Sequence, residues 1–103
     1  MTQPTVIVIG AGRWQVPLIE TCRTLGLRTI AVDADPNAPG FLKADLAINL
    51  SAHASLPVIA AVEELKESWS PIVGVVTKAV RGSIVTTALL AERLRVPGIP
   101  PAT

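Results

Sequence analysis

The sequence predicts an α/β fold, a three-layer doubly wound parallel sheet of about four strands in the order 3-2-1-4. Short apolar runs rich in β-branched residues alternate along the chain with segments of helical periodicity. Strands that are covered on both faces are uniformly apolar in this way, and parallel sheets are covered on both faces. Parallel strands need crossover connections, and right-handed crossovers produce a doubly wound sheet.

The first strand is predicted over Thr5 to Ile9 and is followed by the turn Gly10-Ala11-Gly12. Pro17 is tolerated only in the first turn of a helix, so the first helix should begin near Arg13 to Val16. Gly26 should end this helix as the residue after its C-cap. The expected inward stripe of the helix consists of Leu18, Ile19, Cys22 and Leu25.

Three further strands are predicted, over Arg28 to Val32, Leu46 to Leu50 and Ile72 to Val76. A helix with Ser55 as its N-cap should follow the third strand and bury Val58, Ile59, Val62 and Leu65. Another helix should begin at Gly82-Ser83, with Ser83 as its cap, and bury Val85, Ala88 and Leu89.

The length of 103 residues allows one compact domain, which we assign to residues 1–96. The proline-rich stretch from Val96 to Pro101 cannot continue a helix. We therefore expect residues 97–103 to be a connector that leads into a further domain.

Composition excludes several classes of function. Nine Lys and Arg balance eight Asp and Glu, and aromatic residues make up only 3% of the chain, so neither the charge nor the stacking surface of a nucleic-acid module is present. The single cysteine excludes an internal disulfide and a cysteine-rich zinc site, and we find no metal-ligand cluster. No apolar run is long enough to cross a membrane, and the start of the chain does not resemble a signal peptide. We therefore expect a cytoplasmic protein.

The chemistry of such a sheet lies beyond the carboxyl ends of its strands, where the strand order reverses. For this order the turns after the first and fourth strands should be neighbours. The first turn leads into Arg13, and the second carries Lys78 and Arg81, so three cations should converge on one crevice in a nearly neutral chain. The crevice should take an anionic ligand, a carboxylate or a phosphate, and loss of one arginine should lower affinity roughly ten- to a hundredfold.

Structural alternatives exist for each of these residues. The two glycines can form only a tight turn, and Lys78 and Arg81 can be solvated loop charges. Asp33 and Asp35, after the second strand, can hold ribose hydroxyls or can cap their own loop. We expect Trp14 to pack over the helix, His53 to be structural or solvated, and Cys22 to be a core residue. Ser83 has no base placed for it, so no catalytic residue is assigned.

One interpretation of the glycine turn is a dinucleotide site in an NAD(P)-dependent oxidoreductase. The pattern Gly-x-Gly-x-x-Gly requires a third glycine for close helix–strand packing, and Gln15 occupies that position here. The first two glycines and Asp33 fit the pattern, and the third position does not.

A second interpretation comes from resemblance. The segments that carry it are Val6 to Gln15 (VIVIGAGRWQ), Ile30 to Gly40 (IAVDADPNAPG), Ala44-Asp45, Val75 to Thr77 and Leu94 to Pro100 (LRVPGIP). Together they resemble the N-terminal, Rossmann-like domain of ATP-grasp enzymes, with the large chain of carbamoyl-phosphate synthase the most similar in character, alongside biotin carboxylase and the N5-carboxyaminoimidazole ribonucleotide synthase.

The resemblance implies the substrate-side domain of a ligase that joins a carboxylate to an amine with ATP and magnesium. Substrate would lie along Gly10, Gly12 and Gln15, with Asp33 and Asp35 in the adjoining loop. The ATP-grasp domain would follow as the partner that holds nucleotide and metal, so this chain alone should hold no cofactor and catalyse nothing. The segment from Lys78 to Arg81 is more basic than its counterpart in the family.

A third interpretation is a non-catalytic interaction module, which would expose an apolar patch of several hundred Å². A ligase domain separated from its neighbours would expose such a patch as well. Formation of a homodimer therefore would not distinguish these two interpretations.

Overall fold

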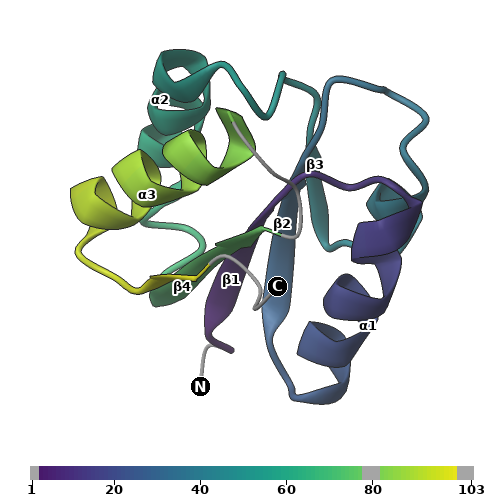
Figure 1. The fold of residues 1–103 in the computed structure, drawn as a ribbon. Coiled ribbons are helices and arrows are strands. Elements are labelled where there is room, and N and C mark those ends of the chain that lie inside the picture. The colour runs from purple at the N-terminus through teal and green to yellow at the C-terminus, as the bar shows by residue number, and fades with distance from the viewer. Residues whose placement is uncertain (1–2, 78–81, 100–103) are drawn as a thin grey trace.

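The protein is built on one parallel sheet with helices on both faces (Figure 1). The computed structural model describes residues 3–77 and 82–99. The strands are β1 (Thr5–Ile9), β2 (Arg28–Val32), β3 (Leu46–Ile48), β4 (Ile72–Thr77) and β5 (Gly98–Ile99). Their order in the sheet is β3-β2-β1-β4-β5, and every neighbouring pair is parallel. The predicted α/β fold and the order 3-2-1-4 are confirmed.

A fifth strand extends the predicted sheet. Val75 and Val76 of β4 pair with Gly98 and Ile99, which lie in the segment expected to be a connector. The helix that precedes β5 lies close to it, because a Cβ atom added to Gly98 would lie 2.6 Å from the Cβ of Ala91. Glycine therefore allows this short strand to run along the edge of β4 beneath the helix.

The helices divide between the two faces of the sheet. They are η1 (Arg13–Gln15), α1 (Val16–Thr24), η2 (Pro39–Leu42), α2 (Ser55–Leu65) and α3 (Gly82–Leu94). Figure 1 shows α1 on one face and α2 with α3 on the other. Because side chains alternate along a strand, Val6 and Val8 of β1 pack towards α1, whereas Ile7 and Ile9 pack towards α2 and α3. In the described part of the chain no helix has the length and apolarity needed to cross a membrane.

Helix α1 follows the prediction except at its carboxyl end. Ile19 and Cys22 are buried, and burial raises the pKa of the Cys22 thiol. Gly26 has a φ of +82°, as expected of the glycine that ends a helix. Leu25 is wrongly predicted, because the helix ends at Thr24 and the Leu25 side chain is 70% exposed.

Helix α2 buries Val58 and Val62 as predicted, with Ile59 and Leu65 packed against the same core. Its predicted cap is wrong: Ala54 is the N-cap, and Ser55 is the first helical residue. The Ser55 hydroxyl instead lies 2.8 Å from that of Thr86 and joins the amino-terminal turn of α2 to α3.

Helix α3 presents the opposite face from the predicted one. Val85 and Leu89 are 55% and 44% exposed, and Ala88 is exposed as well. Ser83 is a buried helical residue rather than the cap. The inward face consists of Ser83, Thr86, Thr87, Leu90 and Ala91.

Small side chains on this inward face let α3 approach the sheet closely. A Cβ atom on Gly98 would also lie 3.3 Å from the backbone oxygen of Thr87. The Thr87 hydroxyl donates to the carbonyl of Ser83 at 2.7 Å, which satisfies a buried polar group within the helix. Val85 and Leu89 therefore face outward, and Leu90 is the large apolar residue that this face buries.

Candidate functional site

The turn after β1 has the backbone geometry that its glycines allow. Gly10 has a φ of +98°, where residues with a Cβ are strained, and its N–H donates to the carbonyl of Val32 at 2.7 Å. Gly12 is the N-cap of η1, and its carbonyl accepts from the N–H of Gln15 at 2.9 Å. The turn therefore leads directly from the carboxyl end of β1 into a helical segment.

The side chain of Gln15 folds back over this turn. Its Nε2 lies 3.0 Å from the position that a Cβ on Gly10 would occupy, and its Oε1 lies 3.3 Å from the equivalent position on Gly12. Gln15 is 7% exposed, and none of the described residues forms a hydrogen bond with its amide. In a dinucleotide site a third glycine would leave this space open, so Gln15 changes what the turn can accept.

Asp33, at the end of β2, closes the other side of the turn. Its Oδ2 accepts a hydrogen bond from the N–H of Ala11 at 2.8 Å, and its Oδ1 accepts one from the N–H of Asp35 at 2.9 Å. Both carboxylate oxygens of Asp33 therefore accept hydrogen bonds from backbone N–H groups. This agrees with the alternative in which Asp33 stabilises its own loop instead of holding a ribose. Asp35 also caps its own loop, because its Oδ1 accepts from the N–H of Asn37 at 2.9 Å.

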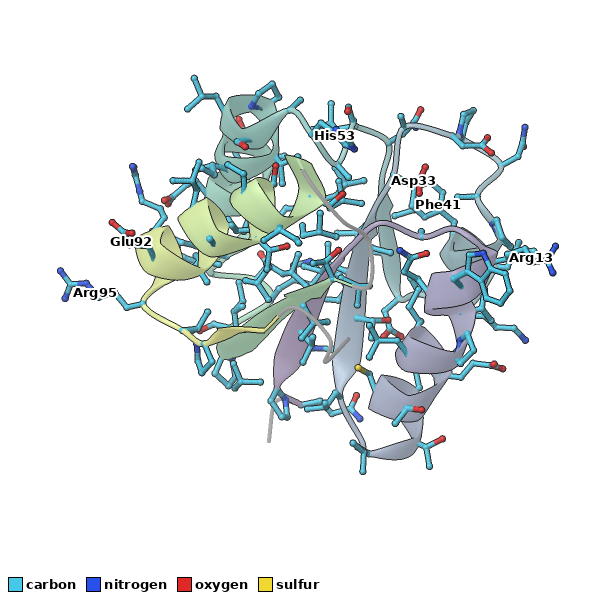
Figure 2. All side chains as sticks on the ribbon, viewed as in Figure 1. Arg13, Asp33, Phe41, His53, Glu92 and Arg95 are labelled. Atoms are coloured by element: carbon cyan, nitrogen blue, oxygen red, sulfur yellow. The ribbon has the colours of Figure 1, made fainter. Side chains whose placement is uncertain are left out.

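A crevice of about 350 Å³ lies between these residues and the start of α3. It is at the carboxyl ends of β1 and β2, where ligands bind in open α/β sheets. Its lining consists of Gly10, Gly12, Gln15, Asp33, Ala34, Ser51, Ala52, His53 and Ser83. Figure 2 shows Asp33 and His53 at this edge of the molecule.

The crevice brings together four of the predicted site residues, Gly10, Gly12, Gln15 and Asp33. Two others, Arg13 and Asp35, do not line the crevice. Arg13 is exposed and places its guanidinium 4.9 Å from the centre of the Trp14 ring. Figure 2 shows Arg13 at the outer edge of the molecule, away from His53. Lys78 and Arg81 lie outside the described residues, so their part in the predicted convergence of cations stays a prediction, whereas Arg13 does not line this crevice.

Trp14 does not pack over the helix as expected. Its side chain is 68% exposed and carries the Arg13 guanidinium on its ring. This pairing accounts for Arg13 without a ligand, because a cation over an aromatic face is an attractive contact.

Five lining residues were not predicted as part of the site: Ala34, Ser51, Ala52, His53 and Ser83. Ser51 and His53 come from the loop after β3, and the N–H of His53 donates to the Ser51 hydroxyl at 3.1 Å. The sequence signal that points to this loop is its position after a strand carboxyl end. The expectation that His53 is structural or solvated did not use that signal.

The remaining motif residues support the turn from outside the crevice. The N–H of Gly40 donates to the carbonyl of Ala11 at 2.7 Å, and a Cβ on Gly40 would lie only 2.6 Å from that oxygen. The Asp45 carboxylate accepts from the N–H of Thr29 at 2.8 Å and so fixes β2 against the chain entering β3. No group of three or more His, Cys, Asp or Glu side chains suited to a metal ion occurs within residues 3–77 and 82–99.

Comparison with solved structures identifies what the fold resembles. Phosphoribosylglycinamide synthetase from Anaerococcus prevotii superposes with a TM-score of 0.73 and 26% identity over 92% of this chain and 23% of that chain. N5-carboxyaminoimidazole ribonucleotide synthetase from Thermotoga maritima has a TM-score of 0.69 and 16% identity, over 93% and 24% of the two chains. No protein-family model and no curated protein matches the chain.

A dinucleotide enzyme also shares the fold. The Bordetella bronchiseptica enzyme WbmG, solved in complex with NAD, superposes with a TM-score of 0.62 and 18% identity over 93% of this chain and 36% of that chain. At this identity the likeness concerns the fold alone. The chain spans about a quarter of the length of the two synthetases. The chain therefore has a Rossmann-like fold that it shares with the N-terminal domains of ATP-grasp enzymes.

Proposed function

We propose that this chain is the substrate-side domain of an ATP-grasp ligase that joins a carboxylate to an amine. The observation that carries the proposal is Gln15, whose amide borders the crevice and forms no hydrogen bond with the described residues. The side-chain amide offers both donors and an acceptor, so a ligand in the crevice can form hydrogen bonds with it. The likeness to the two synthetases supports the class of enzyme.

The substrate we propose is a small molecule with an anionic group, a carboxylate or a phosphate. Gly12 supports this choice, because its N–H forms no hydrogen bond with the described residues and it borders the crevice. ATP and magnesium would be held by a following ATP-grasp domain and not by this chain. Within the class, the motif segments from Val6 to Gln15 and from Ile30 to Gly40 favour an enzyme like the large chain of carbamoyl-phosphate synthase, working in the cytoplasm.

The outward face of α3 supports a partner for the domain. Val85 and Leu89, together with Leu56 of α2 at 78% exposed, place large apolar side chains in solvent. Exposed apolar patches of this kind mark contact surfaces. The following domain is the partner we propose, and a second copy of the chain is the alternative.

The proposal is tested by titrating the chain with ligands of each class. We expect sodium sulfate or acetate to perturb the backbone NMR signals of Gly10, Gly12 and Gln15, while ATP with magnesium and NADH do not bind at micromolar concentration. Saturable quenching of the tryptophan fluorescence of the chain by micromolar NADH would favour the oxidoreductase instead. Tight ATP binding that a Gly12 substitution abolishes would contradict the substrate-side role.

A matched pair of variants separates the two functions. Gln15→Gly restores the third glycine of the dinucleotide pattern, and Gln15→Ala removes the amide without restoring it. A substrate-side domain loses anion binding in both variants. A dinucleotide domain gains NADH affinity only with glycine. In the complete polypeptide, release of ADP that requires both a carboxylate and an amine tests the ligase class itself.

A further inference from the structure

We propose that His53 binds the anionic group of the ligand in this crevice and that protonation of its imidazole controls the affinity. The inference rests on the proposed function, because it concerns the same crevice. It adds a residue that was not selected from the sequence, and it adds a dependence on pH.

The first argument is placement. His53 is held at the crevice by its own loop, since its N–H donates to the Ser51 hydroxyl and the N–H of Ala54 donates to the Ser51 carbonyl at 3.0 Å. These two bonds fix the backbone on both sides of an exposed imidazole. The side chain therefore borders the crevice without being needed for the core.

The second argument is the chemistry of the lining. The amide of Gln15 and the N–H of Gly12 are donors without partners among the described residues. Ser51 accepts from His53, so its own proton is available to donate. The carboxylate of Asp33 already accepts from two backbone N–H groups. Donors therefore dominate the crevice, and donors favour an anion.

The third argument is charge. Among the described lining residues, His53 is the one that can become positive, and Asp33 is the other titratable group that faces the crevice. Aspartate ordinarily titrates far below neutral pH, whereas histidine ordinarily titrates near pH 6.5. Among the described lining residues, histidine is therefore the residue type whose charge can change near neutral pH. An anion should bind more tightly at the lower pH.

The test uses the fact that the chain contains a single histidine. Its imidazole C2–H gives one NMR signal, which is followed from pH 5 to pH 8.5 with sodium sulfate, with sodium acetate, and with sodium chloride at matched ionic strength. Sulfate and acetate keep constant charge from pH 6 upward, unlike phosphate. A response to sulfate indicates a tetrahedral anion, and a response to acetate indicates a carboxylate.

We expect one of these anions to move the midpoint of the imidazole titration to higher pH, and its affinity to fall roughly tenfold or more between pH 5.5 and pH 8. His53→Gln keeps hydrogen-bonding capacity but lacks the charge, so it should bind weakly at both values. His53→Lys should bind at both values with little dependence on pH. Equal midpoints in all three salts, or a pH dependence that survives in His53→Gln, would overturn the proposal.

Failure of this inference is distinguishable from failure of the proposed function. If Gln15→Ala abolishes anion binding while His53→Gln leaves it unchanged, the crevice is a substrate site and His53 has no part in it. If NADH binds instead, the proposed function fails, whatever the behaviour of His53. The far-ultraviolet circular dichroism of each variant checks that the fold is retained.

Discussion

The carboxylate of Asp33 accepts a hydrogen bond from the N–H of Ala11 at 2.8 Å and so joins the end of β2 to the glycine turn after β1. The two residues are 22 positions apart in the sequence. Because Asp33 also accepts from the N–H of Asp35, one side chain fixes two loops that border the crevice. The shape of the crevice therefore depends on a residue whose oxygens are already occupied.

Asp33→Ala should lower the free energy of unfolding by about 1–3 kcal/mol, because it leaves the N–H of Ala11 without its acceptor. Urea denaturation measures the change. Asp35→Ala is the matched control, since Asp35 is exposed and holds only its own loop. Equal and small effects at both positions would show that water replaces the Asp33 carboxylate.

Gly40→Ala should destabilise the protein by about 1–3 kcal/mol, because the added methyl group would meet the carbonyl of Ala11 at 2.6 Å and the Cδ1 of Ile19 at 2.9 Å. Gly74→Ala is the control, since among the described residues its Cβ would meet the carbonyl of Pro97 alone, at an ordinary 3.6 Å. Gly74→Ala should leave the thermal midpoint almost unchanged. A tolerated alanine at residue 40 would mean that η2 shifts freely relative to the turn.

Leu90→Ala and Leu89→Ala compare the two faces of α3. Leu90 is fully buried and should cost about 2–5 kcal/mol when truncated. Leu89 is 44% exposed and should cost less than about 1 kcal/mol. Guanidinium denaturation of both variants, at protein concentrations low enough to keep the chain monomeric, decides the orientation of the helix. A larger loss of stability for Leu89→Ala than for Leu90→Ala would show that the face predicted from the sequence is the buried one.

Glu63 links α2 to α3, and its acid titration should be visible in stability. Hydrogen bonds from Lys66, and then from Arg93, lower the pKa of its carboxyl below the ordinary value of 4.5. A lowered pKa in the folded state stabilises above pH 4.5, and this contribution is lost as the pH falls through the folded value. The effect should be small and should weaken in salt, because the partners are exposed.

Glu63→Gln should therefore flatten the decline of the urea midpoint between pH 5 and pH 3. Glu64→Gln is the control, because Glu64 is exposed and forms no ion pair with the described residues. A control variant with the same flattening would assign the acid dependence to net charge instead of to the link between the helices.

Local pattern was enough to predict most of this fold. The mainly apolar strands β1 to β4, of three to six residues, need two covering layers, and Gly26 must adopt a backbone that disfavours other residues, so both follow from sequence. The two glycines and Asp33 were also placed correctly at the carboxyl edge of the sheet. The strand β5 was missed because two residues carry no periodicity.

What only the tertiary structure decided is which surface each side chain faces. Helix α3 has two possible inward faces. The face with Val85 and Leu89 carries the larger apolar residues, so the sequence predicted that it is buried. The other face is the buried one, because Gly98 lies so close to the helix that only small side chains fit there. The same holds for Gln15 and His53, which lie 38 positions apart and border one crevice because β1 and β3 end at the same edge. The sequence by itself determines which backbone conformations each short segment prefers, because these preferences arise from steric contacts between neighbouring residues. Which distant residues lie side by side is decided only when the strands assemble into the sheet.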